Sequence, residues 1–229
     1  MARHTSWRIG GPADYFCVVE EEQQLFEAVS IAKSAGIPWL VLGGGNNILV
    51  SDDGVEGLVI LNRLRGLAIE DGPTLACAAG VFFAKAAQFT ARQGFTGMEW
   101  GISIPGTVGA GVVNNAGAHW SDVSQALVSA DVVDDKGESR RLTPKMLLYR
   151  YRQSALKRPH LIQSTFVVTS CRFRLAPTEP RAALARLEEF RQHRQETQPI
   201  KEPSAGSTFK NPPGGHAGAL IDRAGLKGR

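Results

Sequence analysis

The apolar positions of the first sixty residues switch between helical and extended spacing. Residues 20–35 carry apolar side chains such as Leu25 and Val29 at helical intervals, which predicts an amphipathic helix. Two short runs rich in branched residues, 39–42 and 58–61, predict strands. The first sixty residues are therefore expected to contain both a helix and strands.

The rest of the chain continues this mixture. The patterns predict strands over 74–79, 128–134, 139–142 and 166–175, and helices over 81–93, 144–149, 180–197 and 217–223. Asp135-Lys136-Gly137 stands between two of these strands and predicts a hairpin. A break rich in proline near residues 199–203 predicts a domain boundary.

A run of glycine and asparagine, residues 43–47, follows the strand predicted at 39–42. Glycine permits positive φ and close approach of the backbone to a ligand, and successive free N–H groups form a nest for an anion such as a pyrophosphate. A Rossmann glycine loop leads from a strand into a helix. Because residues 48–50 have strand character, we expect a strand–loop–strand arrangement and a dinucleotide site of another kind.

A second glycine-rich stretch covers residues 97–117 and carries almost no charge. It is long for a connection within a compact domain and too poor in charge for a solvated linker, so it favours a functional loop. Neither glycine segment is expected to open a clear helix. A lone glycine cluster is more often a structural turn, but two together favour a site that clamps a dinucleotide along its length.

Two polar motifs offer candidate chemistry. In the motif 151–154, Arg152 is either an ordinary surface residue or a group that holds a carboxylate and stabilises negative charge. In the motif 206–212, Ser207 is followed by an ammonium and an amide group. No His–Asp set accompanies Ser207, which argues against a hydrolase nucleophile, so a turn and a catalytic segment both stay open.

Composition limits the classes of protein. The 229 residues have a net charge of +4, which fits a protein that binds anionic small molecules and equally a merely basic surface. No basic block is interleaved with aromatic residues, which argues against nucleic-acid binding. Three scattered cysteines and five histidines lack metal-ligand or disulfide spacing. No signal or membrane-spanning run is present, so we expect a cytoplasmic protein.

Five ordered motifs resemble those of the UDP-N-acetylenolpyruvoylglucosamine reductases. They are Gly-Gly-Pro-Ala-Asp at 10–14, the glycine loop at 42–47, Ile-Pro-Gly-Thr-Val-Gly-Ala at 104–110, Tyr-Arg-Gln-Ser at 151–154 and Gly-Ser-Thr-Phe-Lys-Asn-Pro at 206–212. The resemblance spans nearly the whole chain. It implies an α+β fold with two FAD-binding subdomains of the vanillyl-alcohol-oxidase type, at 1–62 and 63–198, and the start of an incomplete substrate domain at 199–229.

The resemblance also implies a function. The family reduces UDP-N-acetylglucosamine enolpyruvate to UDP-N-acetylmuramate for peptidoglycan synthesis, with non-covalent FAD and with NADPH as reductant. Arg152 would hold the enolpyruvyl carboxylate and stabilise the enolate, and Ser207 would be the proton donor. The substrate would also contact Tyr151, Lys210 and Asn211. The expected cofactor contacts are Gly43, Gly44, Gly45, Asn46, Asn47, Pro105, Gly106, Gly109, Gly111, Asn115 and Gly117. We expect no metal site, because the cysteines and histidines lack ligand spacing, and we expect a monomer or a weak oligomer.

The chain departs from the family pattern at two places. The family has a third catalytic group, a glutamate near its C-terminus, and no residue up to Arg229 matches it. The segment 154–177 is short and lacks the insertion that carries a substrate-covering tyrosine in one branch, and His119 stands where that branch has another tyrosine. We therefore expect the branch without the insertion.

Two other functions stay open. One is an oxidase or dehydrogenase of the same flavin fold that acts on an alcohol or hydroxy acid, against which the motif 206–212 argues. The other is a nucleotide-binding protein without redox activity, which would take up no flavin.

Overall fold

The computed structural model describes residues 1–134, 136–158, 160, 165–198 and 202–228. Its first sheet has three parallel strands in the order β1-β3-β2. The elements of this unit are η1 (Ala2–His4), β1 (Ala13–Val19), α1 (Glu22–Ser34), β2 (Trp39–Leu42) and β3 (Val55–Asn62). Leu25 and Val29 of α1 pack on Val19 and Ile60 of the sheet. A capping box between Glu21 and Gln24 begins α1.

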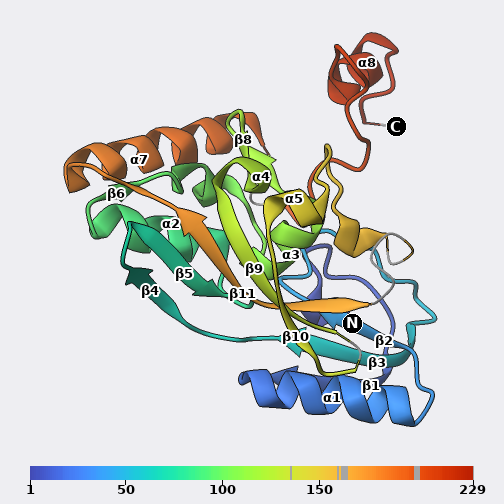
Figure 1. The fold of residues 1–229 in the computed structure, drawn as a ribbon. Coiled ribbons are helices and arrows are strands. Elements are labelled where there is room, and N and C mark those ends of the chain that lie inside the picture. The colour runs from blue at the N-terminus through green and yellow to red at the C-terminus, as the bar shows by residue number, and fades with distance from the viewer. Residues whose placement is uncertain (135, 159, 161–164, 199–201, 229) are drawn as a thin grey trace.

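The second sheet has five antiparallel strands in the order β10-β9-β11-β5-β4. Its strands are β4 (Leu67–Glu70), β5 (Thr74–Ala78), β9 (Leu127–Asp134), β10 (Ser139–Leu142) and β11 (Phe166–Arg174). Figure 1 shows it next to the first sheet, and α1 packs against residues of both sheets. Cys77 of β5 lies opposite Cys171 of β11, and both are buried free thiols.

Helices cover one side of the second sheet. Ala87 and Ala91 of α2 (Phe83–Arg92) pack with Ala183 and Leu187 of α7 (Pro180–Thr197). The shorter elements are β6 (Phe95–Thr96), η2 (Glu99–Ser103), α3 (Val108–Asn114), β7 (Gly117–Ala118), β8 (Ser121–Asp122), α4 (Val123–Ala126), α5 (Pro144–Leu147), η3 (Ala155–Lys157) and β12 (Ala176–Pro177). The largest core cluster lies between these helices and the sheet.

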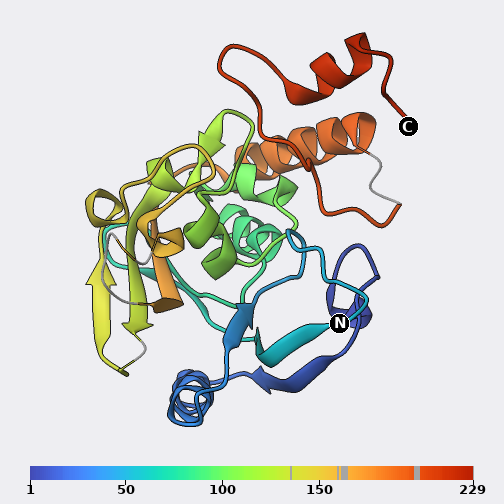
Figure 2. The ribbon, with the colours of Figure 1, turned by 90° about the vertical axis from the view of Figure 1, so that its right-hand side faces the viewer.

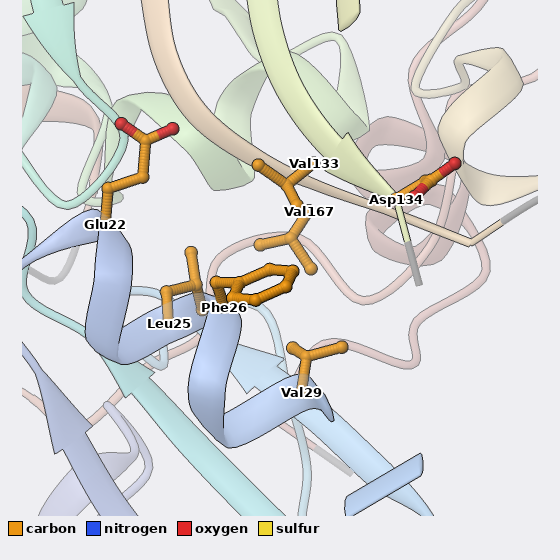
Figure 3. Close-up of a pocket in the computed structure, with 7 residues that line it drawn as sticks. All are labelled: Glu22, Leu25, Phe26, Val29, Val133, Asp134 and Val167. Atoms are coloured by element: carbon orange, nitrogen blue, oxygen red, sulfur yellow. The ribbon is translucent and has the colours of Figure 1, made fainter. Parts of the chain in front are cut away.

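The two sheets meet at α1. Figure 3 shows a small cavity there, with Leu25, Phe26 and Val29 of α1 facing Val133 and Val167 of the second sheet. The contact is close, because a Cβ on Gly137 of the β9–β10 turn would lie 1.9 Å from the ring of Phe26. The cavity is largely apolar and includes none of the predicted site residues, so it serves packing between the subdomains.

The C-terminal residues 202–228 differ from this packed body. Their one helix, α8 (Ala217–Arg223), contains no buried residue. Figures 1 and 2 show this segment, coloured red, extending away from both sheets. The predicted boundary near 199–203 falls partly on residues outside the described ranges, and the divisions at 62/63 and 198/199 stay predictions.

Most predicted elements are confirmed, and two expectations are wrong. Residues 48–50 form no strand, because the chain there crosses back towards residues 10–12, where Gly11 N–H donates to the Ser51 carbonyl at 2.8 Å. Residues 97–117 are not one open loop, since they contain η2 and α3. Glycine lets α3 approach its neighbours closely enough to form a buried helix. The turn at 135–137 joins antiparallel strands as predicted, although residue 135 lies outside the described ranges.

Candidate cofactor and substrate site

The glycine loop 43–47 follows β2, at the carboxyl ends of the three parallel strands. Gly45 has a φ of +66°, and a Cβ there would lie 1.9 Å from the carbonyl oxygen of His4. Ser6 N–H donates to the Gly45 carbonyl at 3.0 Å. The N-terminal residues therefore hold the loop from one side, and only glycine fits this position.

The backbone N–H groups of this loop are available to a ligand. Within the described residues, none of the backbone N–H groups of 43–47 donates a hydrogen bond to the protein. Asn46 donates through Nδ2 to Ser6 Oγ, but its Oδ1 is buried without a partner. Buried polar groups are almost always paired, so a loop with free donors and one orphan acceptor fits a ligand that has both oxyanions and hydroxyl groups. A dinucleotide such as FAD is such a ligand.

The second glycine segment lies directly against the first. A Cβ on Gly43 would lie 2.4 Å from Thr107 Oγ1 and 3.1 Å from the Cβ of Ala110, at the start of α3. A Cβ on Gly44 would lie 3.0 Å from the ring of Phe82. The structure therefore brings together the two segments that the sequence predicts to clamp one ligand.

The glycines of the second segment differ in the space around them. A Cβ on Gly106 would have no neighbour within 4 Å, and Pro105 beside it is exposed. In contrast, a Cβ on Gly109 would lie 2.6 Å from that of Ala79, and one on Gly111 would lie 2.2 Å from the ring of Phe83. Close packing explains these two buried glycines, and any cofactor contact by them stays a prediction.

Arg152 lies on a tight turn beside this segment. Arg150 and Gln153 exchange both backbone hydrogen bonds at 3.0 Å, and Arg152 has a φ of +56°. Its exposed side chain lies near the ring of Tyr151, and its Nη2 is 3.5 Å from the carbonyl oxygen of Gly117. The predicted carboxylate-binding arginine is thus placed at the end of the predicted cofactor segment.

The turn is attached to α3 by buried polar side chains. Ser154 donates to the Val113 carbonyl at 2.6 Å and is fully buried. Asn115 has left-handed backbone and donates from Nδ2 to the carbonyl of Arg150 at 3.2 Å. Its Oδ1 accepts from Ser124 N–H at 3.0 Å, so the protein occupies this side chain. Burial raises the pKa of Tyr149 far above its usual value, which keeps its hydroxyl a donor.

The structure does not bring the C-terminal motif to Arg152. Ser207 and Lys210 are exposed, and Asn211 Oδ1 accepts from Ala217 N–H at 3.1 Å. The described hydrogen bonds of residues 202–228 all stay within that segment. The predicted roles of Ser207, Lys210 and Asn211 therefore stay predictions.

An aromatic groove between β7–β8 and α7 was not assigned from the sequence. His119 stacks on Phe190, with ring centroids 3.9 Å apart, and its Nε2 lies 2.7 Å from Ser103 Oγ. Burial lowers the pKa of His119, and the nearby His193 lowers it further. Trp120 beside it is 95% exposed. In the sequence, this groove is indicated only by the adjacent residues His119 and Trp120, which closely follow the second glycine-rich segment.

Two kinds of feature are missing from the described residues. No cluster of His, Cys, Asp and Glu side chains there has the arrangement of a metal site. No helix among them is long and apolar enough to cross a membrane.

Comparison with known proteins decides the family. Residues 13–143 match the model of an FAD binding domain, and residues 198–229 match that of the UDP-N-acetylenolpyruvoylglucosamine reductase C-terminal domain. UDP-N-acetylenolpyruvoylglucosamine reductase 2 of Symbiobacterium thermophilum is 41% identical over all of this chain and 73% of its own length. The reductase of Rubrobacter xylanophilus is 42% identical over all of this chain and 75% of its own length.

This chain belongs to the UDP-N-acetylenolpyruvoylglucosamine reductase family. A solved reductase of this family, from Thermus caldophilus, has 34% identity and a TM-score of 0.84, and the match covers 100% of this chain and 79% of that one. A glucooligosaccharide oxidase from Acremonium strictum, at 17% identity, matches with a TM-score of 0.58 over 76% of this chain and 38% of its own. The latter likeness shows the fold alone. The expected α+β, FAD-binding fold and family membership are both confirmed.

Proposed function

We propose that this chain is an FAD-dependent reductase of UDP-N-acetylglucosamine enolpyruvate, in peptidoglycan synthesis, with NADPH as the reductant. The observation that carries the proposal is the loop 43–47, which has free N–H groups among the described residues and lies against the start of α3. The turn that carries Arg152 is attached to the other end of that helix. The family membership supports the same reaction.

The loop 43–47 would hold the pyrophosphate of FAD. Its free N–H groups supply donors, and the orphan Oδ1 of Asn46 supplies an acceptor for a hydroxyl group of the cofactor. Pro105, Gly106 and Gly117 would line the rest of the site, together with backbone atoms of Gly109, Gly111 and Asn115. When bound, FAD supplies the hydride that reduces the enol ether.

Arg152 would act on the charge that develops during reduction. Addition of hydride to the terminal enol-ether carbon leaves negative charge on the adjacent carbon and the carboxylate. A guanidinium beside that carboxylate stabilises the charged state more than the neutral alkene, which lowers the barrier. Its fork also holds the carboxylate in one orientation.

The remaining steps fall to the C-terminal motif. Ser207 would protonate the carbanion on one face, a role that requires a strongly basic acceptor because serine is a weak acid. Lys210, Asn211 and Tyr151 would bind the sugar nucleotide. Residues 202–228 would need to approach the Arg152 turn for this, since they bury no side chain where they lie.

The experiment follows the two half-reactions. Purified protein should be yellow, and it should consume NADPH and the enolpyruvyl sugar nucleotide one for one. Ser207→Ala should still let NADPH bleach the flavin but should slow its reoxidation by the sugar nucleotide, typically by about 10²-fold or more. A colourless protein that takes up no FAD would contradict the function, and equal slowing of both half-reactions would make Ser207 structural.

The other proposed properties follow from this reaction. NADPH and UDP-sugars are metabolites of the cytoplasm, which supports a cytoplasmic location. We propose a monomer or weak oligomer that binds neither nucleic acid nor membrane. Turnover of hydroxy acids with oxygen would instead favour the oxidase alternative.

A further inference from the structure

The backbone at Arg152 is unusual for an arginine. The turn 150–153 closes with two backbone hydrogen bonds, and its third residue takes a positive φ, a position at which glycine or asparagine is typical. Such conformations persist only where the surroundings enforce them. The question is therefore which residues enforce this one.

Two buried side chains hold the two ends of the turn on the C-terminal end of α3. At the start of the turn, Asn115 Nδ2 donates to the carbonyl of Arg150 at 3.2 Å. After its end, Ser154 Oγ donates to the carbonyl of Val113 at 2.6 Å. The relative exposure of Asn115 is 5% and that of Ser154 is 0%, so water does not compete for these bonds. The last carbonyls of a helix lack intrahelical partners, and here the carbonyl of Val113 accepts its hydrogen bond from Ser154.

The first end of α3 touches the cofactor loop. A Cβ on Gly43 would lie 2.4 Å from Thr107 Oγ1 and 3.1 Å from the Cβ of Ala110, so this end of the helix leaves no room for a side chain there. The helix spans Val108–Asn114, which corresponds to a length of about 10 Å. One short, buried helix therefore sets the separation between the loop 43–47 and the turn that carries Arg152.

We propose that Ser154 and Asn115 are positioning residues, which hold Arg152 at a set distance from the cofactor loop and thereby make the site selective for ligands that bear a carboxylate. The inference rests on the proposed function. Ser154 acts through the backbone of the turn, and Asn115 uses both polar atoms of its side chain on the protein.

The test compares binding of two sugar nucleotides by calorimetry. UDP-N-acetylmuramate carries a carboxylate and UDP-N-acetylglucosamine lacks it. The dissociation constant of UDP-N-acetylglucosamine divided by that of UDP-N-acetylmuramate therefore measures the contribution of Arg152 to binding. Ser154→Ala should reduce this ratio by about 10-fold or more, because small misplacements of a positioning group have large effects. Affinity for UDP-N-acetylglucosamine and retention of FAD should not change.

Two further variants separate positioning from stability. Thr90→Val is the matched control, since Thr90 is also buried and donates to a carbonyl, that of Ala86 at 2.9 Å, on another helix. It should lose similar stability but keep the ratio. Asn115→Gly keeps the left-handed backbone and removes the side chain. The same ratio measured in this variant tests the inference if Ser154→Ala fails to fold.

A double variant decides whether the effect passes through the arginine. In an Arg152→Ala background, Ser154→Ala should reduce the ratio no further, because the residues act in series. Additive losses, or an unchanged ratio in both Ser154→Ala and Asn115→Gly, would overturn the inference. If the unaltered protein itself does not prefer UDP-N-acetylmuramate, the proposed function fails instead.

Discussion

The two glycine-rich segments of this protein look alike in sequence but use glycine in different ways. In the loop 43–47, glycine leaves a row of N–H groups without protein acceptors among the described residues. In α3, Gly109 and Gly111 lie against Ala79 and Phe83, and their N–H groups donate to carbonyls at 2.9 Å and 3.0 Å. The first segment is available to a ligand, whereas α3 in the second segment is a buried helix that packs against the first.

The difference shows that a glycine-rich segment can serve two physical purposes. Because glycine has no Cβ, its backbone can adopt positive φ and leave N–H groups available to a ligand. The same absence lets two segments of backbone approach each other closely. A substitution should therefore affect ligand binding in one segment and stability in the other. The following predictions test this division.

Gly111→Val should have the largest effect, on stability. Its Cβ would lie 2.2 Å from the ring of the fully buried Phe83, and overpacking of this kind costs about 3 kcal/mol. We expect the melting temperature of the apoprotein to fall by roughly 10 °C. Gly218→Val, on the exposed helix α8 with nothing within 4 Å, is the matched control and should change it little. Equal effects would contradict the packing role.

Gly44→Val should instead remove FAD. The new side chain meets Asn46 Oδ1 and the ring of Phe82, both ends of movable side chains, so the fold should tolerate it. It would cover the free N–H groups and weaken FAD binding by about 100-fold, or ~2.7 kcal/mol. Flavin absorbance after gel filtration measures retention. A variant that keeps its full complement of FAD would show that the loop does not hold the cofactor.

Acid should weaken the sheet that supports α3. Burial would raise the pKa of Asp131, but hydrogen bonds from Arg141, Arg172 and Ser170 lower it to about 2. A lowered pKa favours the ionised form in the folded state. The resulting stability is present above about pH 5 and is lost as the pH falls towards 2. Urea unfolding of Asp131→Asn between these values should show a smaller pH dependence, and an unchanged slope would contradict the assignment.

Gly106→Ala should give the smallest effect. Gly106 belongs to the second segment but has open space around it, so the stability of the apoprotein should stay within about 0.5 kcal/mol. If the cofactor lies there, its affinity should fall by about 5-fold, or ~1 kcal/mol, in a fluorescence titration with FAD. Unchanged affinity would remove Gly106 from the site.

Local patterns predicted the regular elements well. Apolar spacing located α1, α2, α7 and the strands β2, β3, β5, β9, β10 and β11, because each buries one face whose period is visible in the chain. It did not locate the strands β1 and β4. The same approach missed α3, since its glycines lower helix propensity and the compensating contacts come from Ala79 and Phe83, far away in the sequence. Residues 48–50 have strand composition but no strand partner, which composition does not reveal.

The chain by itself determined the family and the candidate groups, because five ordered motifs and their chemistry are read directly from neighbouring residues. Only the tertiary structure decided which glycines are open and that Asn115 and Ser154 hold the Arg152 turn. The reason is that a hydrogen bond or a close contact depends on where two distant segments meet, and this is a property of packing rather than of either segment.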